Sequence, residues 1–297
     1  MIDTVTTPDG RKLEILIAGP DDGAPYVFHN GTPTAVAAYP PLEAMLQDAG
    51  LRMVTYSRPG YGGSTPWSDG AEPTIVDDVA DTVTIADAVD FDTFVTLGWS
   101  GGGPRALGCG ALLPERCRAV VSLAGIAPYG DPALDYFRGM GLENVRDFLA
   151  AMVGREMLGP FVLEQVDELR AVTTDDIVVA FHGLVDEVDA AALTDDFAEW
   201  IARTFRHAAG PGPAGLLEDT MQIVRPWGFD VRTIRVPVAI WQGRHDRMVP
   251  FSHGEWLART IPGARAHLFD DEGHLSLVQR LPEMLAELRE LGGLGPA

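Results

Sequence analysis

The stretch "TLGWSGGGPRA", residues 96–106, places Ser100 between glycines directly after an apolar run. The apolar residues before the serine predict a buried strand over 93–99, and those after it predict a helix over 103–113. Gly98-Trp99-Ser100-Gly101-Gly102 matches G-x-S-x-G, a pattern in which the serine occupies a sharp, strained turn between strand and helix. The neighbouring glycines let the backbone pack closely there. This stretch makes Ser100 a candidate nucleophile on an α/β fold.

Strand and helix signals alternate over residues 1–129 and again over 226–297. The predicted strands are short apolar runs, as in buried parallel sheets, and helical patterns lie between them. This alternation predicts an α/β fold with a mostly parallel central sheet and helices on both faces. The predicted strands cover 12–19, 25–30, 51–56, 93–99, 119–125, 236–243 and 264–270, and the predicted helices include 40–50 and 74–90.

Residues 130–225 break the alternation. Helical patterns follow one another there without a convincing strand, which predicts an all-helical insertion between two strands of the core. We expect this insertion to form a lid over the pocket that Ser100 faces. Its aromatic residues are either packed against the core or in contact with substrate. Four aromatic residues, three from the insertion and one beside the serine, are the candidates for substrate contact: Trp99, Phe137, Phe148 and Trp200.

A nucleophilic serine needs a base, and the base needs a carboxylate that orients it. On this kind of fold the chain order is serine, acid, histidine, with the acid and the histidine each just past a strand. The segment "VAIWQGRHDRMVP" (238–250) places Asp246 there, and "AHLFDDEGHLSLV" (266–278) places His274 after the next strand. His245 precedes the position of the acid, so the order disfavours it as the base. The sequence therefore predicts a Ser100–His274–Asp246 triad.

The reaction also needs hydrogen-bond donors for the oxyanion that develops at the attacked carbonyl group. One donor is expected to be the backbone N–H of Gly101, directly after the nucleophile. The second is expected in the segment "FHNGTPT" (28–34), after a predicted strand. Thr32 is the candidate because Gly31 allows a close turn and Pro33 has no N–H.

Five segments together resemble the α/β-hydrolase superfamily: "HNGTP" (29–33), "SRPGYGGS" (57–64), "GWSGGG" (98–103), "GRHDRMVP" (243–250) and "EGHLS" (272–276). The chain is similar to the lidded serine hydrolases related to proline iminopeptidases, carboxylesterases and C–C bond hydrolases. The resemblance implies that Ser100, Asp246 and His274 form the catalytic triad and that "SRPGYGGS" is a structural loop. Where the family often has His-Gly after the third strand, this chain has Asn30-Gly31.

The resemblance and the triad favour a carboxylesterase-like hydrolase that cleaves a small-molecule ester through an acyl-enzyme. No metal or organic cofactor is expected. An aminopeptidase or a C–C bond hydrolase with the same triad is the alternative among enzymes. A ligand-binding protein that keeps the fold without turnover is the alternative from another class.

The charge of the chain restricts its partners. Lys and Arg number 22 against 43 Asp and Glu, a net charge of −21. Such a surface repels phosphate backbones and anionic lipid, so neither nucleic acid nor a membrane is expected as a partner. The longest apolar stretch, around 119–128, is too short to span a bilayer. Cys109 and Cys117 lack metal-ligand spacing, and the first ten residues show no secretory signal, so we expect a cytoplasmic protein.

Overall fold

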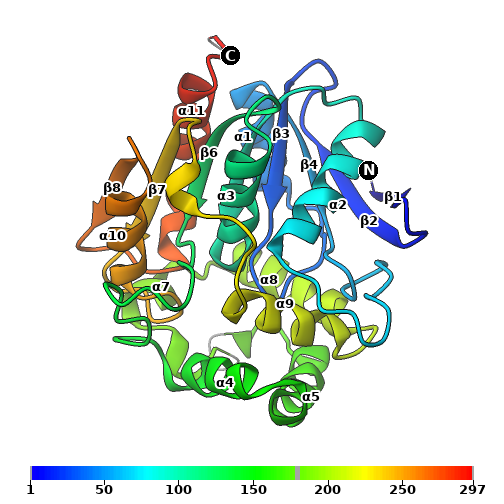
Figure 1. Cartoon of the computed structure of the whole chain (residues 1–297), viewed down its shortest axis with the longest axis vertical. Helices are drawn as coiled ribbons and strands as arrows, with labels where there is room; N and C mark the ends of the chain where they lie inside the picture. Colours follow the sequence, from blue (N-terminus) through cyan, green and yellow to red (C-terminus); the bar gives the residue numbers. More distant parts are fainter. Residues whose placement is uncertain (1, 178–180, 296–297) are drawn as a thin grey trace.

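The computed structural model describes residues 2–177 and 181–295 and contains an eight-stranded sheet (Figure 1). The strands are β1 (Ile2–Thr6), β2 (Lys12–Ala18), β3 (Ala24–His29), β4 (Leu51–Tyr56), β5 (Phe94–Trp99), β6 (Cys117–Leu123), β7 (Val238–Gly243) and β8 (Arg265–Phe269). Their order in the sheet is β1-β2-β4-β3-β5-β6-β7-β8. The pairs from β4 to β8 are parallel, whereas β1–β2 and β2–β4 are antiparallel.

This architecture confirms the predicted α/β fold with a mostly parallel sheet. Strand β1 was not predicted, and the reason is its position at the sheet edge. Of its five residues only Val5 is buried, so the strand carries no continuous apolar run. It pairs with β2 as an edge hairpin, which places antiparallel strands at one side of an otherwise parallel sheet.

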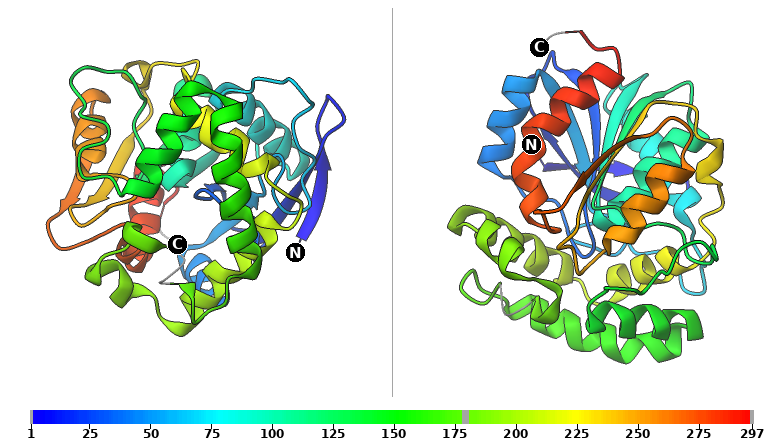
Figure 2. Two further views of the ribbon diagram at one scale, coloured as in Figure 1. Left: turned by 90° about the horizontal axis from the view of Figure 1, so that it is seen from below. Right: turned by 90° about the vertical axis from the view of Figure 1, so that its left-hand side faces the viewer.

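Helices cover both faces of the sheet (Figure 2). Helices α2 (Ile75–Ala88), α3 (Gly103–Leu112) and α10 (Phe251–Thr260) pack on one face, and α1 (Pro40–Ala49) and α11 (Leu281–Leu291) on the other. Each contributes a buried apolar stripe, such as Val79 of α2 or Leu285 of α11. Burial of one such side chain stabilises the fold by about 1.5–3 kcal/mol.

A helical insertion separates β6 from β7. It contains α4 (Leu142–Val153), α5 (Arg155–Ala171), α7 (Glu187–Ala192), α8 (Asp195–Ala209) and α9 (Ala214–Val224). Residues 124–141, which precede α4, run as turns and irregular segments. Figures 1 and 2 show these helices gathered below the sheet and its flanking helices. Among the residues that the structure describes, no helix combines the length and the apolar character that crossing a membrane requires.

Candidate active site

Ser100 lies in a turn between β5 and α3. Every residue of β5 is buried, and Ser100 opens a single 3₁₀ turn, η1 (Ser100–Gly102), that leads into α3. Its φ is +56°, a left-handed value that is strained for a residue with a side chain. A Cβ at Gly98 would lie 2.3 Å from the carbonyl oxygen of Gly102, so the turn closes only with glycine there. The turn has the strand-to-helix geometry that the G-x-S-x-G pattern predicts.

Asp246 and His274 meet at the ends of neighbouring strands. Asp246 follows β7 and His274 follows β8, and Nδ1 of the histidine lies 2.7 Å from Oδ2 of the aspartate. Both side chains are buried. Asp246 Oδ2 also accepts from Gln242 Nε2 at 2.9 Å, and Oδ1 accepts from the backbone N–H groups of Met248 and Val249. The carboxylate is therefore fixed in place as an acceptor.

The pair fixes the protonation pattern of His274. Burial lowers the pKa of this imidazole, but the charge and hydrogen bond of Asp246 and the charge of Asp189 raise it, and the result lies above the ordinary 6.5. Because Nδ1 faces a carboxylate, it carries hydrogen, and Nε2 is the nitrogen left to accept a proton. The ring of Trp99, next to Ser100 in the chain, lies 5.9 Å from the imidazole between centroids. The serine turn and the histidine loop are therefore neighbours.

The loop that carries Thr32 packs directly against the serine turn. A Cβ at Gly31 would lie 3.4 Å from Cβ of Ser100. A Cβ at Gly101 would lie 2.3 Å from Thr32 Oγ1 and 3.5 Å from Thr32 N. The two backbone N–H groups expected to bind an oxyanion thus belong to segments in contact beside Ser100.

A buried carboxylate from the insertion holds the Thr32 loop. Asp219, on α9, accepts from Thr32 Oγ1 at 2.7 Å, from Tyr61 Oη at 3.1 Å, from Arg58 Nε at 2.8 Å and from Arg105 Nη2 at 2.9 Å. Burial raises the pKa of Asp219. The charges of Arg58 and Arg105 lower it by more than burial raises it, so the pKa lies below the ordinary value. The carboxylate is therefore ionised and neutralised by two guanidinium groups.

The two arginines extend this network to the backbone of the turn. Arg58 donates to the carbonyl oxygens of Asn30 at 2.6 Å and Gly31 at 2.9 Å. Arg105 donates to the carbonyl oxygen of Gly101 at 2.8 Å. Because both guanidinium groups also bind Asp219, one network positions the segments of both candidate oxyanion donors.

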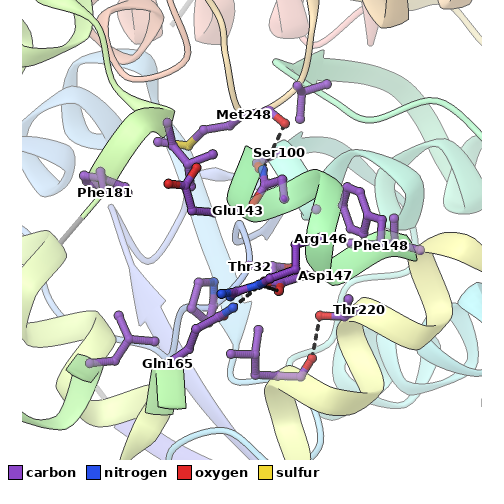
Figure 3. Close-up of a pocket in the computed structure, with 18 of the residues that line it drawn as sticks. Thr32, Ser100, Glu143, Arg146, Asp147, Phe148, Gln165, Phe181, Thr220 and Met248 are labelled. Atoms are coloured by element: carbon purple, nitrogen blue, oxygen red, sulfur yellow. Dashed lines mark hydrogen bonds and ion pairs between the residues drawn. The ribbon is translucent and has the colours of Figure 1, made fainter. Parts of the chain in front are cut away.

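A cavity of about 360 Å³ opens in front of Ser100 (Figure 3). Ser100, Gly101 and Thr32 line it on the core side, and insertion residues form much of the rest of the wall. Figure 3 shows Phe148 and Phe181 on opposite sides of Ser100. Part of the wall is apolar and consists of Phe148, Phe181, Leu184, Phe205, Leu216 and Met248. Another part carries carboxylates, those of Glu143, Asp147, Glu164 and Glu168.

The four predicted substrate-contact aromatics lie in different places. Phe148 lines the cavity. Phe137 instead packs on Tyr136, with ring centroids 5.2 Å apart. Trp99 and Trp200 do not line the cavity: they stack on each other with ring centroids 6.4 Å apart, and Trp200 donates to the backbone carbonyl group of Ala37. Asp189 and Asp219 were not singled out from the sequence, because their contacts join segments distant in the chain and leave no local pattern. Glu143, which lines the cavity, was not singled out either.

Within residues 2–177 and 181–295, no group of three or more His, Cys, Asp or Glu side chains is arranged to hold a metal ion. Cys109 and Cys117 are both buried free thiols.

Comparison with known proteins agrees with the fold. A family model described as alpha/beta hydrolase fold matches residues 25–281. Pimeloyl-[acyl-carrier protein] methyl ester esterase of Aromatoleum aromaticum is 28% identical over 257 residues, which cover 82% of this chain and 87% of the relative. The probable proline iminopeptidase of Leptolyngbya boryana is 23% identical over 86% of this chain and 83% of its own. The crystal structure of a bromoperoxidase from Bacillus anthracis has the same fold, with a TM-score of 0.70, 16% identity and coverage of 98% and 99% of the two chains.

Proposed function

Since the chain belongs to the alpha/beta hydrolase fold family, we propose that it is a serine hydrolase that cleaves a small-molecule ester through Ser100, His274 and Asp246. Its named relatives are enzymes, and the chain is an enzyme of this fold. One observation carries the proposal. Ser100, with a strained backbone, lines a cavity, and a buried histidine, whose ring lies 5.9 Å from that of the adjacent Trp99, is held by a buried carboxylate at 2.7 Å.

The proposed reaction begins with proton transfer from Ser100 to Nε2 of His274. As the proton leaves, Ser100 Oγ attacks the carbonyl carbon of the ester. Asp246 keeps the imidazole in the required tautomer and stabilises the cation that forms. His274 then returns the proton to the leaving alkoxide, and an ester bond to Ser100 remains. A water molecule, deprotonated by His274, hydrolyses this acyl-enzyme and restores the serine.

The developing oxyanion is bound by the backbone N–H groups of Gly101 and Thr32 in this proposal. Donors that are fixed before the reaction stabilise the transition state at little reorganisation cost. The buried Asp219–Arg58–Arg105 network supports this role, since it binds the backbone of the Thr32 loop and that of the serine turn. Loss of one such donor typically lowers kcat by about 10²- to 10³-fold.

The insertion over 130–225 acts as the lid and substrate-binding part, between core segments 1–129 and 226–297. Its phenylalanines provide an apolar wall that fits an alkyl or aryl acyl group, and the cavity volume is within the range of small-molecule sites. The relative named as a methyl ester esterase supports an ester as substrate. We further propose a cytoplasmic location, in keeping with two buried, unpaired cysteines.

A second candidate substrate is an amide or ester with a free amino group. Glu143 Oε2 is buried in the cavity wall and has no hydrogen-bond donor among the described residues. A substrate ammonium group would supply one, and an unpaired buried carboxylate oxygen costs free energy until it is bound. The relative named as a probable proline iminopeptidase is in keeping with this alternative.

Ser100→Ala tests the proposal. We expect hydrolysis of short-chain aryl esters to fall by roughly 10⁴- to 10⁶-fold, as for other triad serines, and labelling by a fluorophosphonate probe to vanish. Ser252→Ala, a serine outside the cavity, is the matched control and should keep wild-type turnover. Ester hydrolysis by Ser100→Ala at the wild-type rate would refute the assignment, and an unlabelled wild type would favour a binding protein. Faster cleavage of aminoacyl arylamides than of esters, lost in Glu143→Gln, would select the second substrate class.

A further inference from the structure

The carboxylate of Asp189 binds the loop that carries His274. Its Oδ2 accepts from the backbone N–H of His274 at 2.9 Å. Its Oδ1 accepts from the backbone N–H groups of Leu275 at 2.8 Å and Ser276 at 2.9 Å. Asp189 is fully buried and belongs to α7 of the insertion, 85 residues earlier in the chain. Three consecutive donors of the catalytic loop thus converge on one side chain from the insertion.

The three N–H groups lie at the start of a helix. His274 and Leu275 precede the short 3₁₀ helix η4 (Ser276–Arg280), and Ser276 is its first residue; the first N–H groups of a helix have no partner within it. The approach is close: a Cβ at Gly273 would lie 2.3 Å from Asp189 Oδ1. Glycine at 273 is therefore what allows the carboxylate to reach the backbone of the histidine loop.

Helix α7 also touches the loop of the triad acid. Asp186, which caps α7 by accepting from the N–H of Val188, places Oδ2 2.9 Å from Nδ1 of His245. His245 directly precedes Asp246 in the chain. One short helix therefore contacts both loops that carry the His–Asp pair, while neither Asp186 nor Asp189 lines the cavity in front of Ser100.

We propose that Asp189 is a positioning residue that sets the place of His274 relative to Ser100, so that α7 must be seated for the triad to work. The inference rests on the proposed serine hydrolase function and adds a part of the insertion to its catalytic apparatus. Asp189 acts through the backbone and the charge of His274 and does not touch substrate.

The negative charge of Asp189 affects the pH dependence of kcat/KM, which a purely structural role would leave unchanged. The charged groups that face His274 are Asp246, in direct contact, and Asp189, whose charge raises the pKa of the imidazole. His274 must be neutral to accept the serine proton, so kcat/KM rises with pH through this pKa. Removal of the charge at 189 lowers that pKa and moves the acidic limb of the pH profile to lower pH.

Asp189→Asn is the decisive variant. An asparagine oxygen can keep the bonds to Leu275 and Ser276, but its NH₂ group then faces the N–H of His274, and the bond to the histidine itself is lost. We expect kcat to fall by up to roughly 100-fold because a displaced base costs that much. KM should stay near the wild-type value, and the acidic limb should shift down. Asp135→Asn, the same charge change at an exposed site of the insertion, is the control and should change neither.

Gly273→Ala is the second variant, because its Cβ expels the carboxylate without changing the net charge. It should lower kcat as Asp189→Asn does, and the double variant should lose little more than the poorer single variant. Wild-type kcat with an unmoved acidic limb in folded Asp189→Asn overturns the proposal. Should Asp189→Asn not fold, wild-type kcat in Gly273→Ala overturns it.

The His274 imidazole can also be titrated by NMR without any turnover. We expect a lower pKa in Asp189→Asn than in the wild type, and an equal pKa would count against the inference. If the wild type neither hydrolyses esters nor reacts with fluorophosphonate, the proposed function fails, and this titration still reports on Asp189.

Discussion

Asp219 and Asp189 are both buried carboxylates that the insertion contributes to the core, and each holds one loop of the candidate active site. Asp219 holds the Thr32 loop, and its charge is balanced by Arg58 and Arg105. Asp189 holds the His274 loop, and its three hydrogen bonds come from backbone N–H groups alone. Asp219 is therefore an ion-pair anchor, held by guanidinium groups, and Asp189 is a backbone anchor, held by N–H groups.

The two anchors have opposite pKa directions. The arginine charges outweigh burial at Asp219 and place its pKa below the ordinary value of 3.8. At Asp189 burial dominates, and although the backbone bonds and His274 oppose it, the pKa lies above 3.8. A buried charge that is left without an opposite charge remains costly, even when it is fully hydrogen-bonded. The carboxylate of Asp219 is thus paired with guanidinium groups in the core, whereas the carboxylate of Asp189 is held by backbone N–H groups and raises the pKa of His274.

The largest expected effect breaks the ion-pair anchor. Asp219→Asn removes the carboxylate partner of buried Arg58 and one of the two carboxylate partners of buried Arg105, which keeps Asp78 at 2.7 Å. We expect the free energy of unfolding to drop by about 3–5 kcal/mol in urea at pH 7. Because the folded pKa of Asp219 is lowered, this contribution is present above pH 3.8 and is lost as the pH falls through the folded pKa. The loss should therefore shrink in strong acid.

The control for this variant is an exposed pair. Asp270→Asn removes the partner of Arg244 at the surface, where both side chains are more than half exposed, and should change stability by less than about 1 kcal/mol. Equal losses for the Asp219 and Asp270 variants would contradict the distinction between a buried network and a surface ion pair.

The next effect concerns turnover at the Thr32 loop. In Gly101→Ala the new Cβ meets Thr32 Oγ1, so the loop moves and its N–H leaves the place of the oxyanion. We expect kcat to fall by about 10²- to 10³-fold, the usual loss for one oxyanion donor. Gly159→Ala, where a Cβ meets open space, is the matched control and should keep wild-type kcat. Undiminished turnover in Gly101→Ala would remove Thr32 from the proposed oxyanion hole.

A smaller effect is expected on the stability of the backbone anchor. Asp189→Asn should lower the free energy of unfolding by about 1–3 kcal/mol, the cost of the buried His274 N–H that loses its acceptor. This is less than for Asp219→Asn, because no buried charge is left unpaired. Urea unfolding of both variants at pH 7 checks the ranking. The reverse order would mean that the backbone anchor carries more of the stability than the ion pairs do.

The smallest effect concerns a half-exposed contact between insertion and core. His207, on α8, lies 2.9 Å from Glu14 of β2. The hydrogen bond to Glu14 raises the pKa of His207 above 6.5, against the opposing effect of burial. The charged pair therefore stabilises the fold below pH 6.5, and this contribution is lost as the pH rises through the folded pKa.

His207→Gln tests this third kind of contact. We expect a loss of less than about 1 kcal/mol at pH 5.5, since a half-exposed pair is screened by solvent, and a smaller loss at pH 9. Urea midpoints at the two pH values measure the difference. A larger loss at pH 9 than at pH 5.5 would show that the charge on His207 is not what stabilises the contact.

Local pattern was sufficient for much of the fold and for the candidate residues at strand ends. The strand before Ser100 and the helix after it follow from an apolar run and a glycine-rich turn, and the structure places both there. Asp246 and His274 lie just past β7 and β8, as the predicted strands require. Strand β1 was not predicted because an exposed edge strand lacks the apolar run that is typical of buried strands.

The sequence predicted the residues that line the cavity less well than it predicted the strands and the candidate triad residues. Four aromatic residues were candidates, and Phe148 is the one among them that lines the cavity. An aromatic side chain packs equally well on a core, on another ring or on a substrate. Its burial and spacing are therefore the same in each case. Phe137 and Trp200 pack against other aromatic rings. No pattern in the sequence distinguishes such a contact from a contact with substrate.

The sequence by itself determined the α/β fold, the turn at Ser100 and the order of the residues that could act with it, because each depends on residues adjacent in the chain. Only the tertiary structure decided which side chains of the insertion meet the core. Asp219 and Asp189 bind partners more than eighty residues away, and the free energy of these contacts comes from burial, charge pairing and unsatisfied N–H groups that exist only once the chain has folded.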